Sequence, residues 1–270
     1  MIFADTLHVA RPTSLKAALR ALREDPTLAP LAGGTDVFVF LNARVHKDTR
    51  YLDLTALDKL AYVKKGKREL VFGALTTFTD CIRSRAVHKI LPSLVAASRE
   101  VGGVQIQNRG TLAGNIANGS PAADGVPVLM AADAIVVLQS IDGEREIPLA
   151  EYYTGYRASV RKADELITEI RVPLEGLAKQ RQYFRKVGTR AAQAISKVVV
   201  AAIGDRIAFG SVAATVVRAR HVEAYLAGGN RDVAEAQTLL QRDIHPIDDV
   251  RSTADYRRRV AANLLAEVLT

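Results

Sequence analysis

The sequence predicts an α+β protein built from two parts. Helical and extended patterns alternate along its 270 residues, with no low-complexity tract and no repeat of fixed period. After residue 179 three extended segments precede three helical ones, an order typical of a separate α+β domain. We therefore expect a first part over residues 1–175 and a second over 176–270, joined at 174–179.

The first 55 residues predict helices and short strands. Ser14 precedes apolar positions at helical spacing over 15–22, as a capping residue precedes a helix. The patterns over 28–32 and 51–54 predict strands, and the pattern over 37–41 predicts the beginning of a helix.

Residues 56–175 predict further strands and helices. Segments 60–64 and 69–73 flank a basic tip and predict a hairpin. The further elements are a helix beginning at Thr79, helices over 91–101 and 126–132, and strands over 134–139 and 167–172.

The second part reads as a block of strands followed by a block of helices. The predicted strands cover 182–187, 196–203 and 207–216, and the predicted helices cover 221–227, 233–241 and 252–269. Ser252 and Asp255 have the spacing of a capping box at the beginning of the last helix.

Composition excludes several classes of protein. No apolar run is long enough to span a membrane, and we expect no signal peptide and a cytoplasmic location. Cys81 is the only cysteine, so no iron–sulfur cluster is expected, and we expect a small buried apolar side chain there. The net charge of +8 comes from scattered residues without interleaved aromatics, which argues against nucleic-acid binding.

The segment Leu31-Ala32-Gly33-Gly34-Thr35-Asp36 runs from a predicted strand into a predicted helix. Glycines let the backbone turn sharply and approach a ligand, and N–H groups near a helix start suit an anion such as pyrophosphate. An ordinary structural turn explains the segment equally well, and it lacks the Gly-x-Gly-x-x-Gly spacing of a Rossmann site.

A second segment, Arg109 to Asp124, is richer in polar groups. It offers hydroxyl, amide and carboxylate side chains from Thr111, Asn115, Asn118, Ser120 and Asp124. Its apolar residues indicate partial burial, and buried polar groups need partners. A large polar ligand would provide them.

Together, LAGGTD and RGTLAGNIANGSPAAD resemble the FAD subunit of the molybdenum hydroxylases, the group that includes xanthine dehydrogenases, aldehyde oxidoreductases and carbon monoxide dehydrogenase. The resemblance extends to segments 184–197 and 248–258, in order, over essentially the whole chain. It implies a two-lobed FAD-binding domain of the vanillyl-alcohol-oxidase (PCMH) type, with lobes near 1–55 and 56–175, followed by a smaller C-terminal α/β domain.

The resemblance also implies a set of FAD-contacting residues. The pyrophosphate loop would comprise Leu31, Ala32, Gly33, Gly34, Thr35, Asp36 and Val37. The second loop would comprise Thr111, Gly114, Asn115, Ala117 and Asn118, with Asp124 near the ribose. Positions beside the ring systems would be Val101, Gly102, Ile106, Ile167 and Lys186. A solvated strand lysine is the alternative for Lys186.

The function implied is electron transfer within a heterotrimer. Such subunits take electrons from two [2Fe–2S] clusters in a small partner, downstream of the molybdenum cofactor of a large partner, and pass them through FAD to NAD or another acceptor. No catalytic side chain and no metal site are expected in this chain, because its five histidines are dispersed. The wording NIANGSPAAD is closest to xanthine-dehydrogenase-like chains, which favours a purine substrate.

Two alternatives share this fold. One is a stand-alone FAD oxidoreductase, which would need its own substrate pocket. The other is a scaffold without FAD, which would show degenerate loops.

Overall fold

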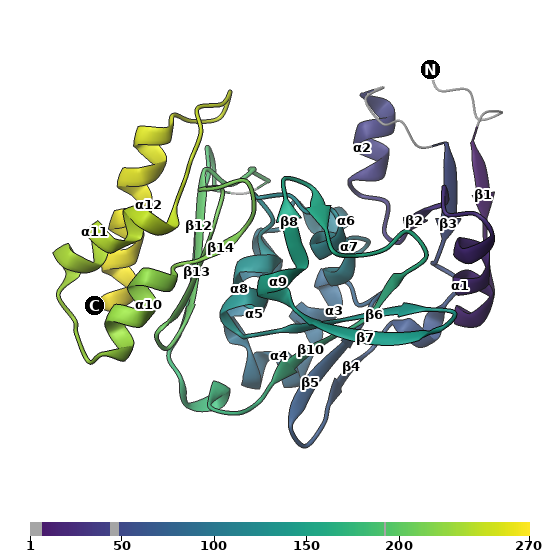
Figure 1. Ribbon diagram of the computed structural model, residues 1–270, viewed down its shortest axis with the longest axis horizontal. Coiled ribbons are helices and arrows are strands. Elements are labelled where there is room, and N and C mark those ends of the chain that lie inside the picture. Colours follow the sequence, from purple (N-terminus) through teal and green to yellow (C-terminus); the bar gives the residue numbers. More distant parts are fainter. Residues whose placement is uncertain (1–6, 44–48, 192) are drawn as a thin grey trace.

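The computed structural model describes residues 7–43, 49–191 and 193–270. Figure 1 shows three sheets arranged along the long axis: a small one near the N-terminus, a central one, and one covered by the C-terminal helices. The predicted α+β fold is confirmed. Its core is continuous through the first two sheets, and a second buried cluster lies under the C-terminal helices.

The N-terminal sheet has the parallel order β1-β3-β2, from His8–Ala10, Arg50–Asp53 and Ala29–Leu31. Helix α1 (Leu15–Glu24) covers it, and the Ser14 side chain accepts a hydrogen bond from the Ala17 N–H at 3.2 Å, as predicted. Strand β2 leads through residues 32–36 into α2 (Val37–Asn42). A glycine-containing loop thus opens at the end of a parallel strand.

The central sheet is antiparallel with the order β4-β5-β10-β6-β7. The strands are Val63–Lys65, Glu69–Gly73, Leu166–Pro173, Ile135–Ser140 and Gly143–Pro148. Strand β10 is central because it pairs with both hairpins, β4–β5 and β6–β7. Strand β7 was not predicted, since its exposed alternate residues include the charged side chains of Glu144 and Glu146.

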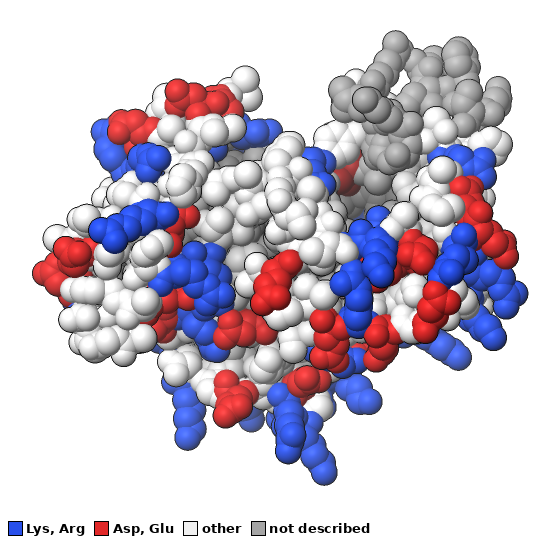
Figure 2. Space-filling view, viewed as in Figure 1, with Lys and Arg blue, Asp and Glu red and all other residues white. Residues whose placement is uncertain are grey.

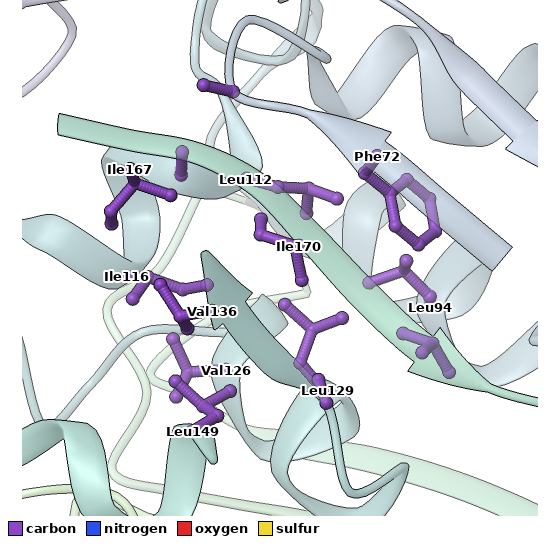
Figure 3. Packing of buried hydrophobic residues seen from close by; sticks show 14 of the residues in the cluster. Phe72, Leu94, Leu112, Ile116, Val126, Leu129, Val136, Leu149, Ile167 and Ile170 are labelled. Carbon is purple, nitrogen blue, oxygen red and sulfur yellow. The ribbon is translucent and has the colours of Figure 1, made fainter. Parts of the chain in front are cut away.

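Short helices pack against this sheet. They are η2 (Asp58–Leu60), α3 (Phe78–Arg83), α4 (Arg85–Ile90), α5 (Pro92–Glu100), α6 (Val104–Gln107), α7 (Leu112–Ala117), α8 (Gly125–Ala131) and α9 (Leu149–Tyr152). Figure 3 shows side chains of these helices meeting those of β5, β6 and β10, among them Leu112, Leu129 and Ile170. This packing fixes α7, which lies within the second polar segment, and α8, which directly follows it.

The predicted helix start at Thr79 is wrong. Thr77 caps α3, and its hydroxyl accepts from the Asp80 N–H while the Asp80 carboxylate accepts from Thr77. Thr77 has an extended backbone because it also forms a bridge with Thr111. The bridge lies between residues distant in sequence, so local side-chain preference alone did not reveal it.

After β8 (Tyr153–Gly155), β9 (Ala158–Ser159) and η3 (Leu177–Lys179), the C-terminal sheet has the order β11-β12-β13-β14. Its strands are Gln182–Val187, Val198–Ile203, Arg206–Gly210 and Val217–Arg218. Helices α10 (Arg220–Ala227), α11 (Val233–Asp243) and α12 (Ala254–Leu269) cover one face.

Two predictions in this part are wrong. The strand predicted over 207–216 ends at Gly210, because Ser211 has a φ of 64°, which is incompatible with a strand. The capping box of Ser252 and Asp255 is absent, because Thr253 caps α12 by accepting from the Tyr256 N–H at 3.2 Å. The Ser252 carbonyl instead accepts from the Asp249 N–H.

Arg218 joins the C-terminal sheet to the preceding part. Its buried guanidinium donates to Glu223 at 2.5 Å, to Asp133 at 2.6 Å and to the Met130 carbonyl at 3.0 Å. Met130 belongs to α8, which packs against β12 and β13. One side chain therefore links the two parts.

Replacing Arg218 with alanine is expected to lower the free energy of unfolding by about 3 kcal/mol, because it removes the buried guanidinium that pairs with both Glu223 and Asp133. Arg220→Ala is the matched control. Arg220 contacts the same Glu223 at 3.3 Å, but its side chain is 60% exposed, so it should cost less than about 1 kcal/mol. Urea titration measures both. Equal losses would contradict a linking role for Arg218.

Candidate functional site

A cavity of about 1290 Å³ lies where the three sheets approach one another. Its walls come from the loop after β2, the segments around α6 and α7, strand β10, and residues 193–196, 211–214 and 245–251 of the C-terminal part. Ligand pockets commonly measure about 300–1,000 Å³, so this one has room for a large ligand. On the face in Figure 2, basic and acidic side chains are intermixed. That face therefore lacks the continuous basic surface that nucleic acids favour.

The structure brings the predicted site residues together. Every one of them lines the cavity except Lys186, which lies behind Asp124. The two polar segments are about 80 residues apart in sequence, yet they form adjoining walls.

The first loop presents unused donors to the cavity. The backbone N–H groups of residues 33–36 donate to no other group among the residues that the structure describes. Gly34 has a φ of 73°, which favours glycine, and turns the chain into α2. Consecutive free N–H groups form a binding site for an anion such as a pyrophosphate.

Gly33 is where the two loops touch. A Cβ atom at Gly33 would lie 1.8 Å from the Arg109 carbonyl oxygen and 3.0 Å from the Gly110 nitrogen. Only glycine allows this approach. An ordinary structural turn does not explain why position 33 must be glycine, because that requirement comes from contact with the second loop.

The side chains of the second loop serve partly to hold the loop itself. The Thr111 hydroxyl accepts from the Gly114 N–H at 3.0 Å and caps α7. The Asn115 side-chain oxygen accepts from the Gly125 N–H at 3.2 Å and so ties α7 to α8. The Asn115 amide nitrogen and the neighbouring backbone are the groups left to face the cavity.

Asp124 and Lys186 form a buried ion pair at the cavity wall. Lys186 Nζ lies 2.7 Å from Asp124 Oδ2 and donates to the Glu100 carbonyl at 2.9 Å, and the lysine side chain is 5% exposed. The solvated-lysine alternative is therefore wrong. Burial raises the pKa of Asp124 to about 6, and the Lys186 charge opposes that rise.

The second oxygen of Asp124 has no partner. Oδ1 is buried and unbonded among the described residues, although Asp124 lines the cavity. Buried polar atoms are normally satisfied, so Oδ1 is available to accept a hydrogen bond from a ligand hydroxyl or N–H group. The cavity thus offers donors at one loop and an acceptor at the other, with apolar residues such as Val101 and Ile167 between them. This arrangement fits a flavin dinucleotide.

Sequence reasoning missed residues that line the cavity from two directions. Tyr156, Arg157 and Arg161 come from the turn between β8 and β9 and from the chain that follows it. Ser196, Ser211, His245, Asp249 and Arg257 come from the C-terminal part. Asp249 and Arg257 lie within a segment that supported the family resemblance, but nothing in chain order placed it at this cavity.

Residues of the C-terminal part hold the second loop in place by hydrogen bonds. The Ser211 N–H donates to the Pro121 carbonyl at 2.7 Å, and Ser211 Oγ lies 2.8 Å from Ser196 Oγ. Arg257 donates to the Ser211 carbonyl at 3.2 Å and to Asp249 at 2.6 Å. The C-terminal part therefore contributes to the site's shape.

Comparison with known proteins decides between the alternatives. Residues 5–175 match the family model described as the FAD binding domain in molybdopterin dehydrogenase, and residues 182–270 match the CO dehydrogenase flavoprotein C-terminal domain. The chain belongs to the FAD-binding subunits of the molybdenum hydroxylases. The flavoprotein is therefore an oxidoreductase subunit that binds FAD, and the predicted two-domain fold is confirmed.

Relatives of this flavoprotein match over nearly their full length. The glyceraldehyde dehydrogenase medium chain of Sulfolobus acidocaldarius is 33% identical over 93% of this chain and 92% of its own. The xanthine dehydrogenase FAD-binding subunit of Escherichia coli O157:H7 is 30% identical over 96% and 94%. Among solved structures, carbon monoxide dehydrogenase from Hydrogenophaga pseudoflava matches with a TM-score of 0.91 and 27% identity, over 97% of this chain and 95% of that one.

The flavoprotein has one cysteine and five histidines. No three metal-ligating side chains gather among its described residues, and His46 lies outside them. Cys81 is buried, as predicted, and burial raises its pKa. No described helix has both the length and the apolar character needed to cross a membrane.

Proposed function

We propose that this flavoprotein is the electron-transfer subunit of a heterotrimeric molybdenum hydroxylase. FAD bound in the cavity would accept electrons from the [2Fe–2S] clusters of a small partner subunit and deliver them to NAD or another acceptor. A large subunit would hold the molybdenum cofactor and determine the substrate. The observation that carries the proposal is the row of unpartnered N–H groups at residues 33–36, facing the cavity.

The residues of this chain have distinct roles in the proposal. The first loop binds the pyrophosphate through backbone N–H groups. Asp124 accepts a hydrogen bond from a ribose or ribityl hydroxyl, and Lys186 positions it from behind. Val101, Gly102, Ile106 and Ile167 enclose the ring systems and exclude water. The remaining predicted residues shape the two loops.

Three further points belong to the proposal. The boundary between the domains falls within 174–179, in the connection that includes η3. The assembly works in the cytoplasm. Its substrate, bound by the large partner, is a purine. The names of the relatives include both a glyceraldehyde and a xanthine dehydrogenase, so the substrate differs between assemblies and depends on the large partner.

A visible absorption spectrum of the purified chain tests cofactor binding. We expect flavin bands in the near-ultraviolet and blue that bleach with dithionite, and heat should release FAD rather than FMN. A chain that stays colourless after incubation with FAD would favour the scaffold alternative. Co-purification of an iron–sulfur subunit and a molybdenum subunit from the native host tests the assembly, and a flavoprotein recovered alone with full dehydrogenase activity would favour the stand-alone enzyme.

A further inference from the structure

Arg157 reaches across the cavity between the two lobes of the FAD-binding domain. It lies at the turn between β8 and β9, where its φ is 52°. Its guanidinium carbon lies 4.9 Å from the centre of the Phe40 ring, and Nη1 donates to the Asn118 side-chain oxygen at 3.0 Å. Phe40 belongs to α2 and Asn118 ends α7, so one side chain contacts an element from each lobe.

The turn that carries Arg157 is held in place from below. Gly119 has a φ of 60°, and a Cβ atom there would lie 3.0 Å from the Arg157 Cα. The turn therefore lies directly on the second loop. This fixed base directs the arginine across the cavity towards α2.

Part of helix α2 is exposed to solvent. Its Phe38 and Val39 side chains are 56% and 60% exposed, and in Figure 1 it projects away from the central sheet. Because α2 directly follows the glycine-containing loop, a contact that holds Phe40 also holds that loop against the second one. Phe40, Asn118 and Arg157 all line the cavity.

The charge of Arg157 also reaches the first loop. Desolvation raises the pKa of Asp36, and the Arg157 charge opposes that rise. A positive charge near these N–H groups adds to their attraction for a dinucleotide diphosphate.

We propose that Arg157 is a latch residue that retains the flavin dinucleotide by joining α2 to α7 across the cavity mouth. The latch comprises Arg157, Phe40 and Asn118. It rests on the proposed binding of the FAD pyrophosphate at residues 33–36. It adds a binding residue from the β8–β9 turn, a part of the chain for which no role was predicted.

The test is the rate at which FAD leaves the full-length chain, measured by the return of flavin fluorescence after dilution. Loss of one stacking contact and one charged hydrogen bond should raise the dissociation rate of Arg157→Ala about tenfold. Arg157→Lys keeps the charge but loses the planar stack and should show a smaller rise. Arg185→Ala, which removes an exposed arginine remote from the cavity, should match the wild-type chain.

A second variant approaches the latch from the other side. Phe40→Leu keeps an apolar residue on α2 but removes the ring, and it should raise the dissociation rate about threefold to tenfold because the stacking contact is lost. In the double variant with Arg157→Ala, the two effects should not multiply, since both remove the same contact. Wild-type rates in both single variants would overturn the latch. If the wild-type chain itself bound no FAD, the proposed function would fail instead.

Discussion

Gly33→Ala is expected to abolish FAD binding and to destabilise the chain. The new methyl group would lie 1.8 Å from the Arg109 carbonyl oxygen, which belongs to backbone and cannot rotate away. The two loops must then separate, which should cost about 3 kcal/mol or more of folding stability. Separation also displaces the N–H groups of residues 33–36, so FAD affinity should fall at least about a hundredfold, or roughly 2.7 kcal/mol. Flavin content per chain and the midpoint of urea unfolding measure the two effects.

Gly155→Ala is the matched control. A Cβ atom at Gly155 has nothing within 4 Å, and Gly155 does not line the cavity. It should change stability by less than about 0.5 kcal/mol and leave the flavin content unchanged. A yellow, fully loaded Gly33→Ala variant would show that the two loops do not need to touch, and the assignment of the pyrophosphate site would fail with it.

Lys186→Met is expected to cost about 3–5 kcal/mol of stability at pH 8, because it leaves the Asp124 carboxylate buried without its partner. Replacing both residues, as Asp124→Leu with Lys186→Met, should cost less than the sum of the single replacements. Urea titration of the FAD-free chain measures all three variants. A double variant that loses the full sum would mean that the two side chains do not interact.

The loss of folding stability caused by Lys186→Met should also depend on pH. Asp124 has a pKa of about 6 in the folded chain, above its ordinary value of 3.8, so its contribution to stability is lost as pH rises through 6. Without Lys186 the folded pKa rises further, and the folded variant keeps its proton to a higher pH. The free energy of unfolding of the variant therefore falls more steeply with pH above 6 than that of the wild-type chain. The loss of stability caused by Lys186→Met should then be smaller at pH 5 than at pH 8. A constant cost across this range would mean that Asp124 is already ionised in the variant at pH 5.

Much of the local structure follows from short-range signals. Ser14 caps α1 as its side chain predicts, and the apolar positions of α1 are buried. The hairpin of β4 and β5 forms where its flanks and basic tip indicate. These features depend on residues within one turn or one hairpin of each other, so the sequence contains all that is needed.

Features that depend on distant residues could not be predicted in this way. Thr77 caps α3 partly because Thr111 holds its backbone extended. The third strand of the C-terminal sheet ends at Gly210, because Ser211 turns to donate its N–H to the Pro121 carbonyl. Lys186, which is expected beside the flavin ring, lies buried against Asp124. In each case the deciding partner is more than thirty residues away in the chain.

The sequence by itself determined the two cofactor loops and, through them, the family. Gly33, Gly34 and Asp124 can be identified in chain order because their chemistry depends on residue type: a missing Cβ, or a carboxylate in an apolar segment. Only the tertiary structure decided that the loops touch at Gly33, that Lys186 neutralises Asp124, and that Arg157 bridges α2 and α7. These relations arise from packing between separate sheets, which fixes distances that chain order does not contain.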